Sequence, residues 1–203
     1  MGVVKLSTAG ILDYSKTSNF LSGNAPVSFG AFDLLETTTL ASGASSVTFS
    51  GLGSYSAYQS LQIRMITRLD VATTNAGLRV NLNGDTGSNY ASHHIEGDGG
   101  GVYVNAQTSQ SFARIGFLPG TGIASAAWGG VIFDLLDFNS SSKNSTMRTL
   151  SGFADDSGTG STPRIYLRSS LWNNTAAVTS IAIGNSDTGN FFAGSRFSLY
   201  GVK

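Results

Sequence analysis

The stretch Leu61–Val71, with the sequence LQIRMITRLDV, decides the fold class of this chain. Apolar side chains occupy its odd positions, with Thr67 as the exception, and polar or charged side chains occupy most of the even ones. A period of two residues is the side-chain period of a β-strand, in which neighbouring side chains point to opposite faces. The stretch therefore predicts a strand with one buried face and one face in water.

Shorter runs of the same kind recur along the chain, separated by turns rich in Gly, Ser and Asn. The run Leu78–Leu82 alternates, and the Asn83–Gly87 segment that follows it is typical of a tight turn with positive φ. No window keeps the apolar spacing of an amphipathic helix. About ten short strands without intervening helices favour an all-β fold with two antiparallel sheets packed face to face, a β-sandwich of the jelly-roll or concanavalin-like kind. The other candidate strands are Leu34–Leu40, Val47–Ser50, Phe112–Leu118, Val131–Phe138, Arg148–Phe153, Arg164–Leu171, Val178–Ile183 and Arg196–Val202.

The beginning of the chain differs from the rest, because residues 1–30 show no sustained period. We expect these residues to form an N-terminal arm and residues 31–203 to form the sandwich domain. A terminal arm stays mobile until a partner binds it, so an arm is a natural anchor in an assembly. Asp13, Tyr14 and Leu21 are therefore candidate assembly contacts.

A second candidate contact is the run Val131–Phe138, which is apolar on both faces apart from its two Asp residues. Such a run predicts a strand in the middle of a sheet or a strand that a partner covers. Val131 and Phe133 are the candidate contact residues of this run.

Composition excludes several classes of function. The chain has 203 residues, 12 Lys and Arg against 12 Asp and Glu, and no Cys. A net charge of zero gives no overall field that would attract nucleic acid. No stretch approaches the roughly 20 apolar residues of a membrane span. We therefore expect neither nucleic acid nor a membrane as a partner, and no cofactor or metal.

The sequence contains no complete set of residues for hydrolytic catalysis. The only imidazoles, His93 and His94, are adjacent and would point to opposite faces of a strand, so at most one could serve a given site. Glu96 and Asp98 would share one face, as the paired carboxyls of a glycosidase must. The third acidic position that sandwich-fold glucanases carry is Gly100 here. The chain is therefore predicted not to be an enzyme.

A ligand-binding loop remains open as a hypothesis. An indole can stack on a sugar ring, so Trp172 with His93, Glu96 and Asp98 forms a candidate glycan or ligand loop. The alternative is that Trp172, like Tyr58, packs inside the sandwich at the end of a sheet.

Four blocks of sequence occur in order along most of the chain. They are Val47–Leu52 with Tyr58–Arg64 (resembling ITFSSIPxTYxxLxIR), Leu78–Asp85 (LRFNGD), Ser170–Ile181 (GLWxNTAAITSI) and Gly194–Lys203 (GSxFSLYGIK). Together these blocks resemble a family of tailed-bacteriophage virion proteins. One departure is that Gly53 and Ser54 stand where that family usually has Pro, which affects the geometry of one turn.

The resemblance implies a non-enzymatic particle component that forms a homo-oligomer, with a trimer favoured. The leading hypothesis is a capsid decoration or cement protein on the outer surface of the virion, bound to the major capsid protein or to other virion proteins. One alternative is a tail-fibre or adhesin domain that binds host glycans. A weaker alternative is a glycan-active enzyme, which would need the carboxylate that Gly100 replaces.

Overall fold

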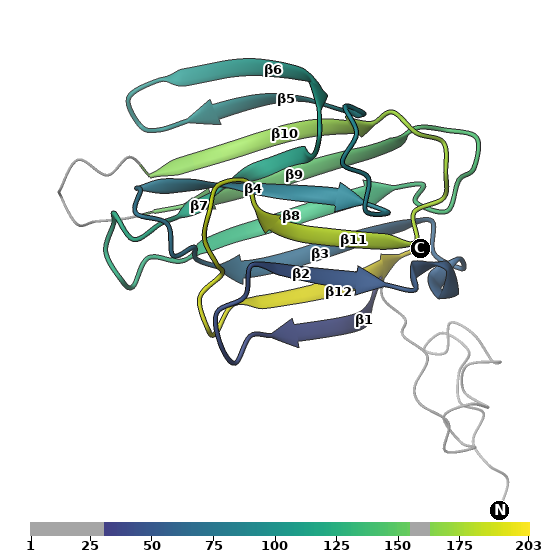
Figure 1. Cartoon of the computed structure of the whole chain (residues 1–203), viewed down its shortest axis with the longest axis horizontal. Coiled ribbons are helices and arrows are strands. Elements are labelled where there is room, and N and C mark those ends of the chain that lie inside the picture. The colour runs from purple at the N-terminus through teal and green to yellow at the C-terminus, as the bar shows by residue number, and fades with distance from the viewer. Residues whose placement is uncertain (1–30, 155–162) are drawn as a thin grey trace, which may run out of the picture. The chain divides into compact units, whose positions relative to one another are not determined.

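The computed structural model describes residues 31–154 and 163–203, and these residues form two stacked β-sheets (Figure 1). Every strand pair whose register is defined is antiparallel. The eight-stranded sheet has the order β1 (Phe32–Thr39), β12 (Arg196–Val202), β3 (Ser60–Thr67), β8 (Gly129–Leu136), β9 (Ser145–Phe153), β10 (Arg164–Trp172), β5 (Tyr90–Gly97) and β6 (Val102–Gln110). The four-stranded sheet has the order β2 (Ser46–Ser50), β11 (Ser180–Asn185), β4 (Asn75–Leu82) and β7 (Ala113–Pro119). The prediction of an all-β, two-sheet antiparallel sandwich is confirmed.

The stretch that predicted the fold forms β3, in the interior of the eight-stranded sheet. Its odd residues Leu61, Ile63 and Met65 are at most 2% exposed, as the alternation predicts. The regular strand ends at Thr67, and Leu69 continues only as an isolated bridge to Phe191. The sequence pattern therefore extends past the strand, because Leu69 is still buried by the core outside it.

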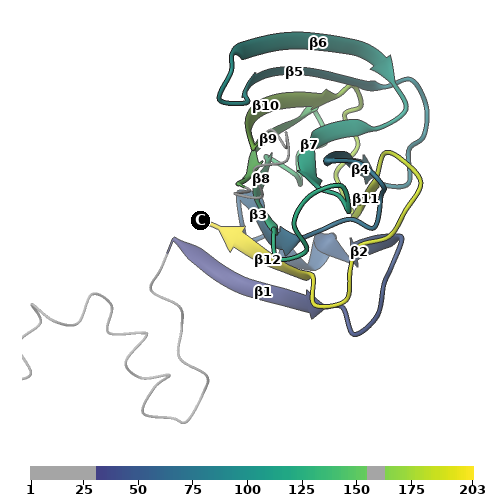
Figure 2. The same cartoon turned by 90° about the vertical axis from the view of Figure 1, so that its left-hand side faces the viewer.

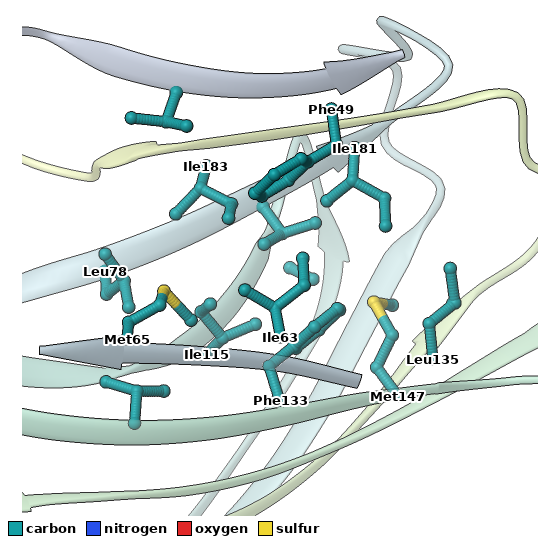
Figure 3. Close-up of a cluster of buried hydrophobic side chains, with 14 of the residues drawn as sticks. Phe49, Ile63, Met65, Leu78, Ile115, Phe133, Leu135, Met147, Ile181 and Ile183 are labelled. Carbon is teal, nitrogen blue, oxygen red and sulfur yellow. The ribbon is translucent and has the colours of Figure 1, made fainter. Parts of the chain in front are cut away.

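The core lies between the two sheets, where side chains of both interdigitate (Figure 3). Phe133 of β8 and Phe49 of β2 are fully buried, and so are Ile115 of β7 and Ile183 of β11. Burying each such side chain contributes about 1.5–3 kcal/mol, so this layer supplies the main stabilisation of the sandwich.

The predicted turn after β4 is also present. Asn83 and Gly84 both have positive φ, at 52° and 69°, and the Asp85 amide donates to the Leu82 carbonyl across 2.9 Å. Asn tolerates this conformation and Gly has no Cβ to oppose it, which is why this pair occupies the turn.

The two sheets differ in width, and this difference leaves strands uncovered. Figure 2 shows β5 and β6 extending past β7, the edge strand of the smaller sheet. Most residues of β6 are accordingly exposed on both faces. The inner side of β5 and β6 is therefore open beyond β7.

The compact unit that includes the core comprises Leu34–Lys203. The predicted arm, residues 1–30, lies outside the described residues.

Candidate functional site

The outer face of the eight-stranded sheet carries an exposed aliphatic row. The row consists of residues in direct cross-strand register from β8 to β6: Ile132, Leu150, Leu167, Ile95 and Val104. Their exposed fractions range from 42% for Ile132 to 76% for Val104. Single exposed apolar residues are normal, whereas a contiguous row across neighbouring strands is typical of a binding surface.

A second row beside it contains glycines. Gly130, Gly152 and Gly97 align with the exposed Ile165 and Val102, two residues along each strand from the aliphatic row. Because the glycines have no side chains, the sheet is hollowed there, with a shallow depression of about 510 Å³ over Gly130 and Gly152. The outer face therefore offers apolar ridges beside apolar hollows, which another surface can fill.

Polar side chains border the aliphatic row on its other side. Asp134 accepts hydrogen bonds from Gln62 Nε2 at 2.8 Å and from Arg148 Nη2 at 3.4 Å. Arg64 donates from Nε to Gln62 Oε1 at 2.8 Å and lies over the Tyr200 ring. An apolar band with a polar border has the composition of a protein interface.

The two contact residues predicted on β8 are wrong. Val131 and Phe133 point into the core and are 3% and 0% exposed, so neither reaches a partner. The strand lies inside the sheet, which is one of the two alternatives that its pattern predicted, and Ile132 is its residue exposed on the outer face. Asp13, Tyr14 and Leu21 lie outside the described residues.

The predicted ligand loop does not come together. His93 is exposed on the outer face of β5, whereas Glu96 points to the inner side. Asp98 lies in the β5–β6 turn, where its carboxylate accepts from the amides of Gly100 and Gly101 at 3.0 Å each. These three side chains therefore have no common site.

Trp172 also has no face free for a sugar, because it is 1% exposed. Its indole Nε1 donates to Asp85 Oδ2 at 2.6 Å, and its ring stacks on Tyr90 with centroids 6.5 Å apart. The Trp172 bond is the main reason why the pKa of Asp85 is below 3.8. Trp172 thus fixes the turn after β4 to the end of β10, and Tyr58 packs partly buried against the same core.

The structure assembles a different polar site on the inner side of β5 and β6. We name it the arginine cleft, a hollow of about 450 Å³ beside β7. Its lining residues are His94, Glu96, Tyr103, Val104, Asn105, Gln107, Arg114, Phe117, Arg164 and Arg168.

Two side chains of β7 reach this cleft because the strand is irregular. Register shifts between Arg114 and Gly116, which leaves Ile115 as an extra residue. A regular strand would put Arg114 and Phe117 on opposite faces, whereas the bulge allows both to line the cleft. Gly116 has φ +144°, and a Cβ there would lie 2.1 Å from Ser151 Oγ, so β7 needs glycine at this close approach.

Glu96 is held by partners on both sides. Arg164 Nη1 donates to Glu96 Oε1 at 2.9 Å, and His94 Nε2 lies 3.4 Å from Glu96 Oε2. Burial lowers the pKa of His94 below 6.5, and the charge of Arg168 lowers it further. His94 is therefore neutral at pH 7.

Arg168 is the least satisfied charge in the described part of the chain. Its side chain is 2% exposed, and Nη1 donates to Ser92 Oγ at 3.2 Å. Within the described ranges, Nε and Nη2 have no hydrogen-bond partner. Burial lowers the pKa of Arg168 to about 10, with a further contribution from Arg114, so the group is still charged at neutral pH.

Sequence reasoning missed this cleft, although one signal was available. Arg164, Tyr166 and Arg168 alternate on one face of a predicted strand, and that face is the inner one. A charged inner face is unusual in a sandwich core and points to an opening there.

Within the described ranges, no group of three or more His, Asp or Glu side chains is arranged to hold a metal ion. Nor does any helix there have the length and apolarity to cross a membrane. No protein-family model matches the chain, and no curated protein matches it.

Proposed function

We propose that this chain is a non-enzymatic structural protein of a tailed-phage particle, acting as a capsid decoration protein. The observation that carries the proposal is the aliphatic row on the outer face of the eight-stranded sheet, which extends from Ile132 to Val104 in register. A surface of this kind functions by covering another surface. The resemblance of four sequence blocks to phage virion proteins is the reason for proposing a phage particle.

The occupant we assign to the outer face is a second copy of the chain. Eight strands spaced about 4.8 Å apart and about eight residues long give a face of roughly 1,000 Å². A stable interface buries about 800 Å² on each partner, so the face is large enough. The formal net charge of zero means that two copies do not repel each other overall.

A face that packs on its own copy is self-complementary and closes as a two-fold pair, so we propose a pair here in place of the trimer that the resemblance favoured. The polar border of Asp134 and Arg148 would then form the rim around the apolar band. Attachment to the shell uses surfaces other than this face, and residues 1–30 are the segment we assign to it.

Binding to empty capsids tests the function. Purified chain should saturate phage shells stoichiometrically, as measured by co-sedimentation, and a chain lacking residues 1–30 should remain folded and fail to bind. Isolated tails are the control, and they should retain none of the chain. Binding to tails instead of shells would refute the decoration role, and binding to neither would refute a place in the particle.

A further inference from the structure

We propose that the arginine cleft binds a carboxylate-bearing sugar of the uronic-acid type, whose carboxylate pairs with the Nε and Nη2 atoms of Arg168. This site is separate from the outer face, and the inference does not depend on the proposed function.

The first argument is the unpaired edge of Arg168. A buried cation is costly to fold unless its donors are satisfied, and Nε and Nη2 have no partner within the described residues. These two nitrogens form the planar fork that a carboxylate accepts with both oxygens. A ligand carboxylate would therefore supply the bonds that the protein leaves unmade.

The second argument is the charge around the cleft. Three arginines line it, Arg114, Arg164 and Arg168, against the single carboxylate of Glu96. His94 is neutral at pH 7, and Arg164 already binds Glu96. A chain with no net charge thus concentrates positive charge in one hollow, which favours an anion.

The third argument is the character of the rim. Asn105 and Gln107 present amides, and Tyr103, a residue that is 51% exposed, presents a phenol. Phe117 adds an aromatic ring, which stacks on Tyr166 at 4.9 Å between centroids and has the Arg114 guanidinium 5.2 Å from its own centroid. Amides suit the hydroxyl groups of a sugar and aromatic rings suit its apolar face. A volume of about 450 Å³ holds one or two sugar rings, within the size of small-molecule sites.

Entry to the site requires a side chain to move. Nε and Nη2 are covered by surrounding atoms, so the carboxylate has to displace part of the rim. Arg114 is the candidate on β7 because it is only partly buried. It donates to Ser186 Oγ at 3.1 Å and lies over the Phe117 ring, so its displacement would also uncover that ring.

The test is calorimetric titration of the full chain with three probes: galacturonic acid oligomers, the matching neutral galactose oligomers, and inorganic phosphate. We expect the acidic oligomer to bind and the neutral one to bind at least about 10-fold more weakly, the loss that follows from removing a charged hydrogen-bond pair. In NMR spectra, the Arg168 Nε–H resonance should shift on addition of the acidic oligomer.

Two variants assign the effect to the cleft. Arg168→Met removes the fork while filling a similar volume, and it should weaken binding of the acidic oligomer by about 10- to 100-fold. Arg114→Gln changes a partly exposed residue, so this variant should fold even if Arg168→Met does not. It should weaken binding of the acidic oligomer by a smaller factor than Arg168→Met does. His93→Gln, on the opposite face of β5, is the matched control and should leave binding unchanged.

Three results of these titrations would each contradict a different part of the proposal. Equal binding of acidic and neutral oligomers, or unchanged binding in both arginine variants, would overturn the proposal. Phosphate that binds more tightly than the acidic oligomer would overturn the assignment to a sugar carboxylate. Failure of shell binding in the capsid experiment would leave this site untouched.

Discussion

Replacing two leucines of the aliphatic row should separate self-association from folding. Leu150 and Leu167 face each other across β9 and β10 and are 45% and 56% exposed. The double variant Leu150→Thr, Leu167→Thr keeps strand-forming residues at both positions and removes most of the apolar area that a partner would cover. The substituted hydroxyls favour water over an apolar interface.

The magnitude follows from the area still exposed. Fully burying a leucine contributes about 1.5–3 kcal/mol, and about half of each side chain remains to be buried, so each contributes about 1 kcal/mol to association. A two-fold pair contains each residue twice, so the double variant should lose about 4 kcal/mol. The dissociation constant should therefore rise about 1,000-fold.

Sedimentation equilibrium measures this change, with the free energy of unfolding measured by urea denaturation alongside it. Because the two positions are on the surface, the unfolding free energy at low protein concentration should change by less than about 1 kcal/mol. Tyr103→Thr is the matched control, since Tyr103 is 51% exposed on the inner side of the same sheet. A wild-type chain that stays monomeric at high concentration, or a variant that associates as tightly as wild type, would refute the reasoning.

Three predictions concern stability. Burial and the charge of Arg168 lower the pKa of His94 in the folded chain, so the unfolded chain takes up this proton first as the pH falls. The free energy of unfolding should therefore be highest above about pH 6.5 and should fall below it by up to about 1.4 kcal/mol per pH unit. In urea denaturation, His94→Gln should make this fall shallower, and an unchanged pH dependence would contradict the reasoning. Asp85→Asn should cost about 1.5–3 kcal/mol by weakening the 2.6 Å bond from Trp172, and a double-mutant cycle with Trp172→Phe should show coupling between the two changes. Gly116→Ala should cost about 2–4 kcal/mol, because its Cβ would lie 2.1 Å from Ser151 Oγ at a strained φ; thermal unfolding that is unaffected would show that β7 can relax.

The residues of the outer face show how far the pattern of a single strand can be interpreted. The run around β8 is apolar on both faces, and this correctly placed it inside a sheet. The pattern does not say which of the two faces meets the core, so it predicts Val131 and Phe133 as exposed contacts, whereas Ile132 is the exposed residue. A shift of one residue reverses every side chain of a strand, and only the packing of β8 against the opposing sheet, which contains β7, decides the choice.

The uncovered strands β5 and β6 show the opposite case. Neither is among the candidate strands of the sequence analysis. The outer face of β6 is apolar at Val102 and Val104 but exposed, and the inner side of β5 carries His94 and Glu96. A long alternation of large apolar side chains is typical of a strand with one buried face, and β5 and β6 have no long run of this kind. Strands that extend beyond the opposing sheet do not need an apolar inner face, because no second sheet covers them.

The sequence by itself indicated two packed antiparallel sheets, because many short strands with one apolar face, and no helical windows to cover that face, favour burial against a second sheet. It also determined the turn at Asn83 and Gly84, where local backbone chemistry suffices. Only the tertiary structure decided that one sheet is wider than the other, and hence that Arg168 lies buried beside an open cleft. The relative width of two sheets depends on contacts between residues far apart in the chain, and no local pattern records those contacts.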